Sequence, residues 1–251
     1  MIVTGAARGM GAEIAREAAR QGARVVAVDR VAGAWQDLVR GIGGMAIESD
    51  LTKSGNPEAV VEAAIKRYGR LDVLVNNAGM LRVAPMLETS EADVDAILNV
   101  NVKAAFFMTQ SAVSAMIKLG GGSIVNIASI AGTAANPGNA IYGISKAAMI
   151  SLTWQTAVEF GPQGIRCNSV SPGMTNWGMV GTNFTDQMKE GRAKLVPARR
   201  LATPEDIAGA VMFFASDVSQ YVSGESLLVD GALSKSLLGL IPVMSAAGGT
   251  Q

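Results

Sequence analysis

Three residues in the middle of the chain have the types and the spacing needed to move a proton to or from an oxygen atom. Tyr142 and Lys146 are four residues apart, so in a helix their side chains share one face. A phenol titrates near pH 10 and carries protons poorly at neutral pH, but a nearby ammonium group favours the phenolate. Ser129 lies thirteen residues before Tyr142 and offers a hydroxyl that can hold the same oxygen atom. This combination predicts general acid–base chemistry.

A glycine-rich turn, TGAARGMG, occupies residues 4–11. Its glycines allow a tight turn and a close approach of the backbone to a phosphate group, and a helix that follows adds free N–H groups and the positive end of its dipole. The spacing is GxxxGxG rather than GxGxxG, and the Gly-Lys-Ser/Thr of a Walker loop is absent. The alternative is an ordinary strand-to-helix turn. The residues that we expect to contact a dinucleotide here are Gly5, Arg8, Gly9, Met10 and Gly11.

An acidic residue at the end of the second predicted strand bears on the choice between NAD and NADP. Asp29 follows Gly11 by eighteen residues, where a carboxylate can accept hydrogen bonds from the adenosine ribose and repel a 2′-phosphate. This position favours NAD, although the same Asp could be a solvated turn residue. Arg8 and Arg30 could instead pair with the 2′-phosphate, so NADP is not excluded.

Two further candidates follow the third predicted strand. Asp50 and Leu51 lie in the segment SDLT at 49–52 and could contact the adenine of a bound dinucleotide. The alternative for this segment is to cap the helix that follows, because Ser, Thr and Asp are common N-cap residues.

Short β-branched runs alternate with amphipathic helical patterns along most of the chain. The predicted strands are residues 2–4, 24–28, 45–49, 71–76, 123–129, 165–170 and 226–229, and the predicted helices are 11–21, 57–68, 91–119, 140–160 and 204–215. Several strands are almost entirely apolar, which indicates that both of their faces are covered. We therefore predict an α/β fold with a doubly wound parallel sheet and helices on both faces.

This fold brings the candidate residues together. Ligands of an open parallel sheet bind at the carboxyl ends of its strands. The fourth predicted strand ends in NNAG at 76–79, and the fifth ends at Ser129. Both ends, and the start of the helix that carries Tyr142 and Lys146, should face the crevice beside the glycine-rich turn. A cationic nicotinamide in that crevice would add to Lys146 in favouring the phenolate.

Composition excludes several classes of function. The chain has no histidine, which rules out Ser-His-Asp hydrolysis and His-ligated metals, and its one cysteine, Cys167, can build neither a disulfide framework nor a cysteine metal cluster. Lys plus Arg and Asp plus Glu both number 21, so no basic surplus favours nucleic acid. No apolar run reaches the roughly 18 residues of a membrane span. We expect a cytoplasmic protein with no metal and no nucleic-acid or membrane partner.

The chain reads as one domain with a distinct tail. We predict a single nucleotide-binding domain at residues 1–232, in which 174–200 form a substrate loop, and a tail at 233–251 that packs at a subunit interface. Charged residues make up 17% of the chain, below the roughly 25% of an ordinary domain. A chain so lightly charged is expected to bury surface in an oligomer.

Taken in order, these segments resemble the short-chain dehydrogenase/reductase family in its compact single-domain branch. The resemblance covers over nine-tenths of the chain, from Thr4 to Gly231. The segments that carry it are TGAARGMG at 4–11, VDR at 28–30, DLT at 50–52, NNAG at 76–79, Asn101-Val102, Ser129, YGISK at 142–146, SPG at 171–173 and LVDG at 228–231.

The resemblance implies a Rossmann-like sheet of about seven strands and reversible hydride transfer between a nicotinamide cofactor and an alcohol or carbonyl compound. It implies that the catalytic residues are Asn101, Ser129, Tyr142 and Lys146. In this scheme Asn101 supports a water-linked proton relay through Lys146, which also binds the nicotinamide ribose. A homotetramer built through the helices 91–119 and 140–160 is the habit of the family.

Further cofactor contacts follow from the same resemblance. The residues implied to line the cofactor cleft are Asn77, Ala78 and Gly79, of which Asn77 could be purely structural, with Ile127, Pro172 and Gly173 beside the nicotinamide. The chain also departs from the family pattern. Its first strand has only two residues before the turn, and Ala232 replaces a terminal glycine. Trp177 stands where a Thr usually binds the carboxamide, so Thr175 is our candidate for that contact.

Three functions are compatible with this reading. The first is an NAD-dependent oxidoreductase acting on a secondary alcohol or ketone. The second is an NADPH-dependent 3-oxoacyl thioester reductase of fatty-acid type, in which Arg199 and Arg200 could bind a phosphopantetheine carrier. The third is a catalytically silent nucleotide-sensing scaffold. The apolar residues of the loop 174–200 favour an apolar or medium-sized carbonyl substrate, without identifying it.

Overall fold

The computed structural model describes residues 1–31, 35–177 and 185–236. Within these ranges the strands are β1 (Ile2–Thr4), β2 (Val26–Asp29), β3 (Met45–Glu48), β4 (Val73–Asn76), β5 (Gly122–Ile127), β6 (Ile165–Pro172) and β7 (Ser226–Val229). The helices are α1 (Gly9–Arg20), α2 (Gln36–Gly41), α3 (Asn56–Tyr68), α4 (Glu91–Leu98), α5 (Ala104–Lys118), α6 (Ala140–Phe160), α7 (Asp186–Leu195) and α8 (Pro204–Ala215). Residues 178–184 of the predicted substrate loop and 237–251 of the predicted tail lie outside the described residues.

The strands form one parallel sheet in the order β3-β2-β1-β4-β5-β6-β7. The predicted α/β fold with a doubly wound sheet of about seven strands is therefore confirmed. Chain order reverses between β1 and β4, where Ile2 pairs with Leu74 and Val3 with Val75. Such a reversal opens a crevice at the carboxyl ends of the two strands, and this is where ligands bind in open α/β sheets.

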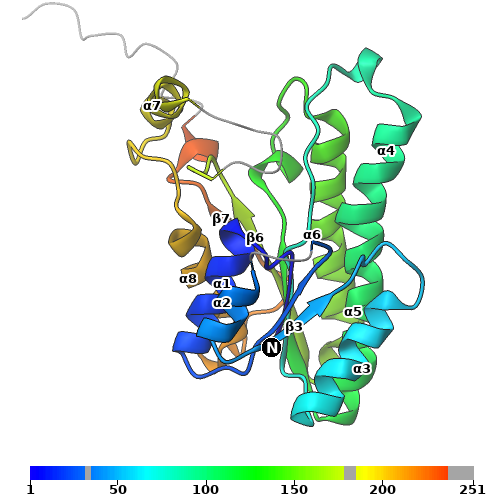
Figure 1. Ribbon diagram of the computed structural model, residues 1–251. Coiled ribbons are helices and arrows are strands. Elements are labelled where there is room, and N and C mark those ends of the chain that lie inside the picture. The colour runs from blue at the N-terminus through cyan, green and yellow to red at the C-terminus, as the bar shows by residue number, and fades with distance from the viewer. Residues whose placement is uncertain (32–34, 178–184, 237–251) are drawn as a thin grey trace, which may run out of the picture.

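Helices cover both faces of the sheet because successive strand residues point to opposite sides. Figure 1 shows α1, α2 and α8 on one side and α3, α4, α5 and α6 on the other. Val3 and Val75 belong to the buried cluster that includes Ile14 of α1. Their neighbours Ile2 and Leu74 belong to a second buried cluster, on the side of α3 and α5. This double burial explains why the strand sequences are almost continuously apolar.

The region 91–119 is not one helix, as the sequence pattern predicted. It consists of α4, a π-helical turn at Asn99–Lys103, and α5. Asn and Val are weaker helix formers than Ala or Leu, and π turns are often found at functional sites. The turn places Asn101 against the loop that follows β4.

Two helices were not expected from the sequence. The short helix α2 follows β2, and α7 lies within the predicted loop 174–200. Thr185 caps α7, because its side chain accepts a hydrogen bond from the backbone N–H of Met188 at 3.2 Å. Figure 1 shows α7 at the end of the molecule opposite the N-terminus, beyond the carboxyl ends of the strands. None of the helices in residues 1–31, 35–177 and 185–236 is long and apolar enough to cross a membrane.

Candidate active site

The hydroxyl of Thr4 joins the ends of β1 and β4. It donates to the carbonyl of Val75 at 3.2 Å and accepts from the backbone N–H groups of Asn77 and Ala78, each at 3.0 Å. The Asn77 side chain donates to the carbonyls of Thr4 at 2.9 Å and Gly5 at 3.1 Å. In this structure Asn77 therefore holds the glycine-rich turn against the NNAG segment. This contact agrees with the purely structural role that the sequence left open for Asn77.

The glycines of the turn are required by close packing as well as by backbone conformation. A Cβ atom on Gly5 would lie 2.9 Å from the Cα of Ala78, and one on Gly11 would collide with the Gly5 carbonyl and lie 2.5 Å from the Asn77 amide nitrogen. Gly5 and Gly9 have φ angles of 65° and 57°, which side chains rarely adopt.

The start of α1 has the features of an anion site. Its N-cap residue, Arg8, makes no side-chain cap, so it offers the first N–H groups of the helix no side-chain acceptor. These N–H groups and the positive end of the helix dipole suit a phosphate. The residues of the turn therefore fit the diphosphate of a dinucleotide.

Asp29 lies at the end of β2 and is held against this turn. One carboxylate oxygen accepts from the backbone N–H of Ala7 at 3.0 Å and the other from that of Val31 at 3.3 Å. The carboxylate is half-buried, whereas Arg8 and Arg30 are exposed. The Ala7 N–H thus holds the carboxylate of Asp29 at the glycine-rich turn.

Asp50 does not cap a helix. Helix α3 starts at Asn56 with Gly55 as its N-cap, so the capping alternative was wrong. Instead, the Asp50 carboxylate accepts from the backbone N–H of Thr52 at 3.0 Å and from its hydroxyl at 2.7 Å. These hydrogen bonds lower the pKa of Asp50. Its neighbour Leu51 is half-buried against the apolar cluster on the α3 side of the sheet.

Ser129 and Tyr142 meet because a short 3-10 helix packs tightly on α6. Ser129 follows β5 and begins the 3-10 helix Ile130–Gly132, where its side chain accepts from the Ala131 N–H at 3.1 Å. A Cβ on Gly143 would lie 2.9 Å from the Ala131 carbonyl oxygen, so only glycine fits at this contact. The Ser129 hydroxyl is hydrogen-bonded to the Tyr142 side chain. The structure thus brings together two of the proton-handling residues found in the sequence.

Burial sets the pKa of Tyr142. It raises the pKa of the phenol, and the hydrogen bond from Ser129 lowers it by less. The direction is opposite to the lowering that we predicted from the spacing of Tyr142 and Lys146. The Lys146 nitrogen lies 5.7 Å from the centre of the Tyr142 ring. In this structure the phenol is therefore in its neutral form at pH 7.

Lys146 is almost completely buried, with 4% of its surface exposed. Its ammonium donates to the carbonyl of Ile127 at 2.8 Å, and burial lowers the pKa of Lys146 to about 8. A Cβ on Gly79 would lie 3.6 Å from the Lys146 nitrogen and 3.4 Å from Asn101 Oδ1, so these two residues flank Gly79. The Ile127 side chain is buried in the core, so what this residue presents to Lys146 is its carbonyl oxygen.

Asn101 is a brace between the loop after β4 and α6. Its Oδ1 accepts from the Met80 N–H at 2.7 Å, and its amide nitrogen donates to the Met80 carbonyl and the Ser145 hydroxyl, each at 2.9 Å. Ser145 in turn donates to the Tyr142 carbonyl at 2.7 Å. Met80 and Ser145 were missed in the sequence, although Ser145 stands three residues after Tyr142 and so on the same helix face.

The end of β6 is held against β7. Pro172 is buried and pairs with Val229, and the Gly173 N–H donates to the Val229 carbonyl at 3.0 Å. A Cβ on Gly173 would lie 2.6 Å from that of Asp230, which explains the glycine. Thr175 donates its hydroxyl to the carbonyl of Trp177 at 2.7 Å. The Thr175 hydroxyl, which we proposed as a contact of the nicotinamide carboxamide, thus donates its hydrogen bond to a backbone carbonyl two residues further along the chain.

The chain is similar to oxidoreductases along nearly its whole length. A family model described as enoyl-(acyl carrier protein) reductase matches residues 5–234. A 3-oxoacyl-(acyl-carrier-protein) reductase of Thermotoga maritima is 38% identical over 92% of this chain and 96% of its own length. A D-threitol dehydrogenase of Mycolicibacterium smegmatis is 36% identical over 92% of this chain and 90% of its own.

Further matches point in the same direction. An L-rhamnose 1-dehydrogenase (NAD(P)(+)) of Azotobacter vinelandii is 38% identical over 93% of this chain and 95% of its own length. Among solved structures, a putative short-chain alcohol dehydrogenase from Sinorhizobium meliloti superimposes with a TM-score of 0.89 at 33% identity, and the match covers 94% of this chain and 96% of that one.

Proposed function

The chain belongs to the short-chain dehydrogenase/reductase family and is an oxidoreductase, and we propose that it interconverts a secondary alcohol and a ketone with NAD. The observation that carries this proposal is the meeting of Ser129, Tyr142 and Lys146 beside the glycine-rich turn. The nicotinamide, when bound, supplies or accepts the hydride. The chain's own residues handle the substrate oxygen and its proton.

We assign the proton to the Tyr142 hydroxyl. Because burial keeps the phenol neutral, it is ready to protonate the oxygen of a carbonyl substrate at pH 7. The Ser129 hydroxyl holds the same oxygen. In the oxidative direction Tyr142 must accept a proton as phenolate, and the buried Lys146 ammonium supplies the positive charge that favours it. We assign Asn101 a positioning role, since its side chain fixes Met80 and Ser145.

Replacing Asp29 with Asn tests the preference for NAD. The substitution keeps the shape of the side chain but removes its charge. We expect kcat/KM with NAD to fall by about 10- to 100-fold, the worth of hydrogen bonds to a charged group, and kcat/KM with NADP to rise. Asp37→Asn is the matched control, because Asp37 is exposed on α2 and pairs with Arg40. A parent protein that prefers NADP would contradict the assignment.

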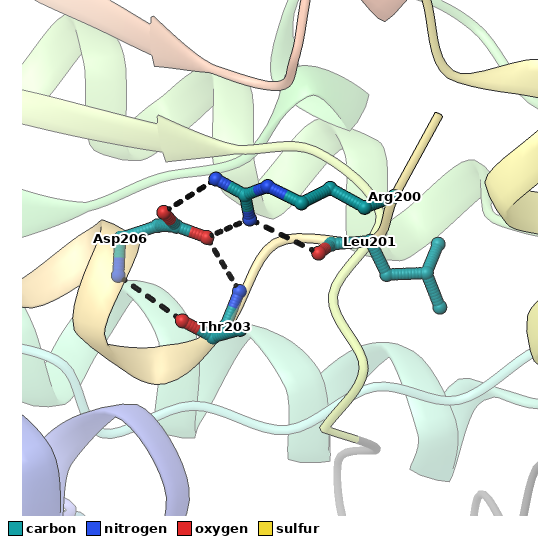
Figure 2. A network of polar contacts seen from close by, with 4 residues as sticks. All are labelled: Arg200, Leu201, Thr203 and Asp206. Atoms are coloured by element: carbon teal, nitrogen blue, oxygen red, sulfur yellow. Dashed lines mark hydrogen bonds and ion pairs between the residues drawn. The ribbon is translucent and has the colours of Figure 1, made fainter. Parts of the chain in front are cut away.

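The second candidate function is reduction of a 3-oxoacyl thioester with NADPH. It is supported by the name of the Thermotoga maritima relative. The two arginines that we considered for a phosphopantetheine carrier are engaged within the chain. Figure 2 shows Arg200 paired with both carboxylate oxygens of Asp206, one at 2.8 Å, and this pair holds the pKa of Asp206 at about 2.

The Arg200 pair stabilises the start of α8. The Asp206 carboxylate also accepts from the Thr203 N–H at 2.8 Å, and the Thr203 hydroxyl accepts from the Asp206 N–H, which completes a capping box (Figure 2). Arg199 donates to the Lys194 carbonyl at 2.7 Å. A carrier would have to compete with these contacts, and we therefore rank this function second.

A substrate panel separates the two functions. NADH and NADPH formation and consumption would be followed with polyols, sugars, cyclic and steroid alcohols, and 3-oxoacyl thioesters. We expect turnover with NAD and a secondary alcohol. Turnover confined to NADPH and thioesters would replace our proposal by the second function. Binding of cofactor with no turnover on any member of the panel would favour the nucleotide-sensing scaffold.

We propose that the enzyme is a cytoplasmic homotetramer in which residues 1–232 act as one nucleotide-binding domain. Apolar side chains are exposed on two adjacent helices, notably Phe106 (47%) on α5 and Trp154 (51%) and Val158 (80%) on α6, and such surfaces usually mark interfaces. The tail contact that we predicted falls mainly on residues 237–251, outside the described residues. The lone cysteine, Cys167, is buried and suits a reducing compartment.

Replacing Val158 with Glu is expected to dissociate this assembly, because a charge would be buried without a partner. Sedimentation should then give the mass of a dimer or monomer, whereas the parent sediments as a tetramer. Val83→Glu is the matched control, since Val83 is also exposed (63%) but lies in the loop after β4. A parent protein that sediments as a monomer would refute the tetramer.

A further inference from the structure

The side chain of Trp177 lies against the glycine-rich turn, far away in the sequence. A Cβ on Gly9 would collide with the indole nitrogen and would lie 2.7 Å from Cδ1 and 3.0 Å from Cε2. These distances place the face of the five-membered ring, beside the indole nitrogen, against Gly9. The absence of a side chain at Gly9 thus serves two purposes, because it permits the φ of 57° and makes room for the indole.

The segment that carries Trp177 is held by the backbone. Thr175 forms a parallel bridge with Ala202. The Asn176 N–H donates to the Ala202 carbonyl at 2.9 Å, and the Ala202 N–H donates to the Met174 carbonyl at 2.9 Å. The Thr175 hydroxyl then fixes the carbonyl of Trp177 itself. These contacts, all within described residues, direct the indole toward the turn.

Trp177 adds a hydrogen-bond donor at the start of α1. The indole N–H can only donate a hydrogen bond. It lies beside Gly9, the first residue of the helix, where the backbone N–H groups have no side-chain cap. The indole N–H and the backbone N–H groups could donate to the same anion at the start of α1. Because 46% of Trp177 is exposed, the ring also keeps free surface that can cover a ligand.

We propose that Trp177 is a cofactor-binding residue whose indole N–H donates to the diphosphate of the nicotinamide dinucleotide at the Gly9 end of α1. The ring covers that end of the site and shields the hydrogen bonds there from water. This inference rests on the proposed function, since it takes the bound molecule to be a dinucleotide. It gives Trp177 a contact with the diphosphate rather than with the carboxamide.

Binding of nucleotide fragments to the full-length chain tests the assignment without any turnover. ADP-ribose carries the diphosphate, whereas adenosine does not. We expect Trp177→Phe, which keeps a ring but removes the N–H, to weaken ADP-ribose binding about tenfold in calorimetry. Adenosine binding should stay within about twofold of the parent. Trp177→Ala should weaken ADP-ribose further, because the cover is lost as well.

Tyr221→Phe is the control, because the Tyr221 side chain is fully exposed. It should leave both affinities unchanged. Addition of ADP-ribose should also change the intrinsic tryptophan fluorescence of the parent and of Tyr221→Phe, and most of this change should be lost in Trp177→Phe.

Gly9→Ala provides a second, independent reading of the contact. In the parent the new methyl group would collide with the indole, and alanine would also be strained at the positive φ of this position. In a Trp177→Ala background only the backbone strain remains, so the loss of ADP-ribose affinity caused by Gly9→Ala should be several-fold smaller. Equal losses in the two backgrounds would mean that the residues do not act together, and would overturn the proposal.

Two other results would overturn it. Unchanged ADP-ribose affinity in Trp177→Phe and Trp177→Ala would exclude the indole as a ligand of the diphosphate. Tighter binding in Trp177→Ala would mean that the indole competes with the nucleotide. A parent that binds ADP-ribose as expected but oxidises no alcohol would refute only the proposed reaction, whereas a parent that binds neither ADP-ribose nor NADH would refute both.

Discussion

Tyr142→Phe is expected to lower kcat by about 100- to 10,000-fold, the usual contribution of a positioned general acid or base. The substitution removes one oxygen atom and keeps the ring. Ser129 can still hold the substrate oxygen, but the hydroxyl that supplies its proton is gone. NADH affinity should stay within about twofold of the parent, because the turn and Asp29 are untouched. The split between kcat and affinity separates a lost catalytic group from a damaged fold.

The measurement is steady-state turnover with NAD and the best alcohol of the panel, together with calorimetric titration of NADH. Tyr221→Phe is the matched control, since the Tyr221 side chain is fully exposed near the end of α8 and should change neither quantity. Activity of Tyr142→Phe within about tenfold of the parent would remove the phenol from the mechanism. It would leave Lys146 as the remaining candidate for the proton.

The fold was predictable because its signals are local. Apolar strands, glycine-rich turns and helical periodicity each occupy a few residues, and the predicted strands agree with those observed to within two residues at each end. The π turn at Asn99–Lys103 was not predictable in the same way. It accompanies hydrogen bonds from Asn101 to Met80 and Ser145, and such contacts between distant segments leave no trace in helical periodicity.

The chemistry of the site was predictable in part. The sequence identified Ser129, Tyr142 and Lys146, and the structure brings the three together. The sign of the Tyr142 pKa shift was wrong, because spacing along a helix reports proximity to a charge but not burial. Trp177 was recognised as a departure from the family pattern, but its contact with Gly9 depends on the bridge between Thr175 and Ala202, which the sequence does not reveal.

Lys146→Met is the second substitution with a large expected effect. It should lower activity, and it should change how the stability of the protein depends on pH. Removing the ammonium should lower kcat for alcohol oxidation by about 100-fold or more, because the phenolate loses its neighbouring charge. The same charge is costly to the folded protein. Lys146 is buried, and its pKa is lowered from 10.5 to about 8, which corresponds to roughly 3 kcal/mol against the charged form.

The sign of the stability effect follows from proton binding. Between pH 8 and 10 the unfolded chain holds a proton on Lys146 and the folded chain releases it, so the free energy of unfolding rises with pH through this window. Below pH 8 both states are charged and the full cost is present. The raised pKa of Tyr142 has the opposite effect near pH 10, because the unfolded chain loses the phenol proton first, but Tyr142 is present in both the parent and the variant.

Urea unfolding of the parent and of Lys146→Met at pH 7, 8.5 and 10 measures this cost. The parent should gain stability relative to the variant as the pH rises, by up to roughly 3 kcal/mol across the full window. At pH 7 the variant gains from the lost charge but leaves the Ile127 carbonyl without its donor, which costs about 1–3 kcal/mol. The two chains should therefore be similar at pH 7 and differ most at pH 10.

Lys66→Met, at an exposed position on α3, is the control, and its stability should follow that of the parent at all three pH values. If the difference between parent and Lys146→Met does not change with pH, Lys146 keeps its proton throughout, and the ammonium would then be available to Tyr142 at every pH tested.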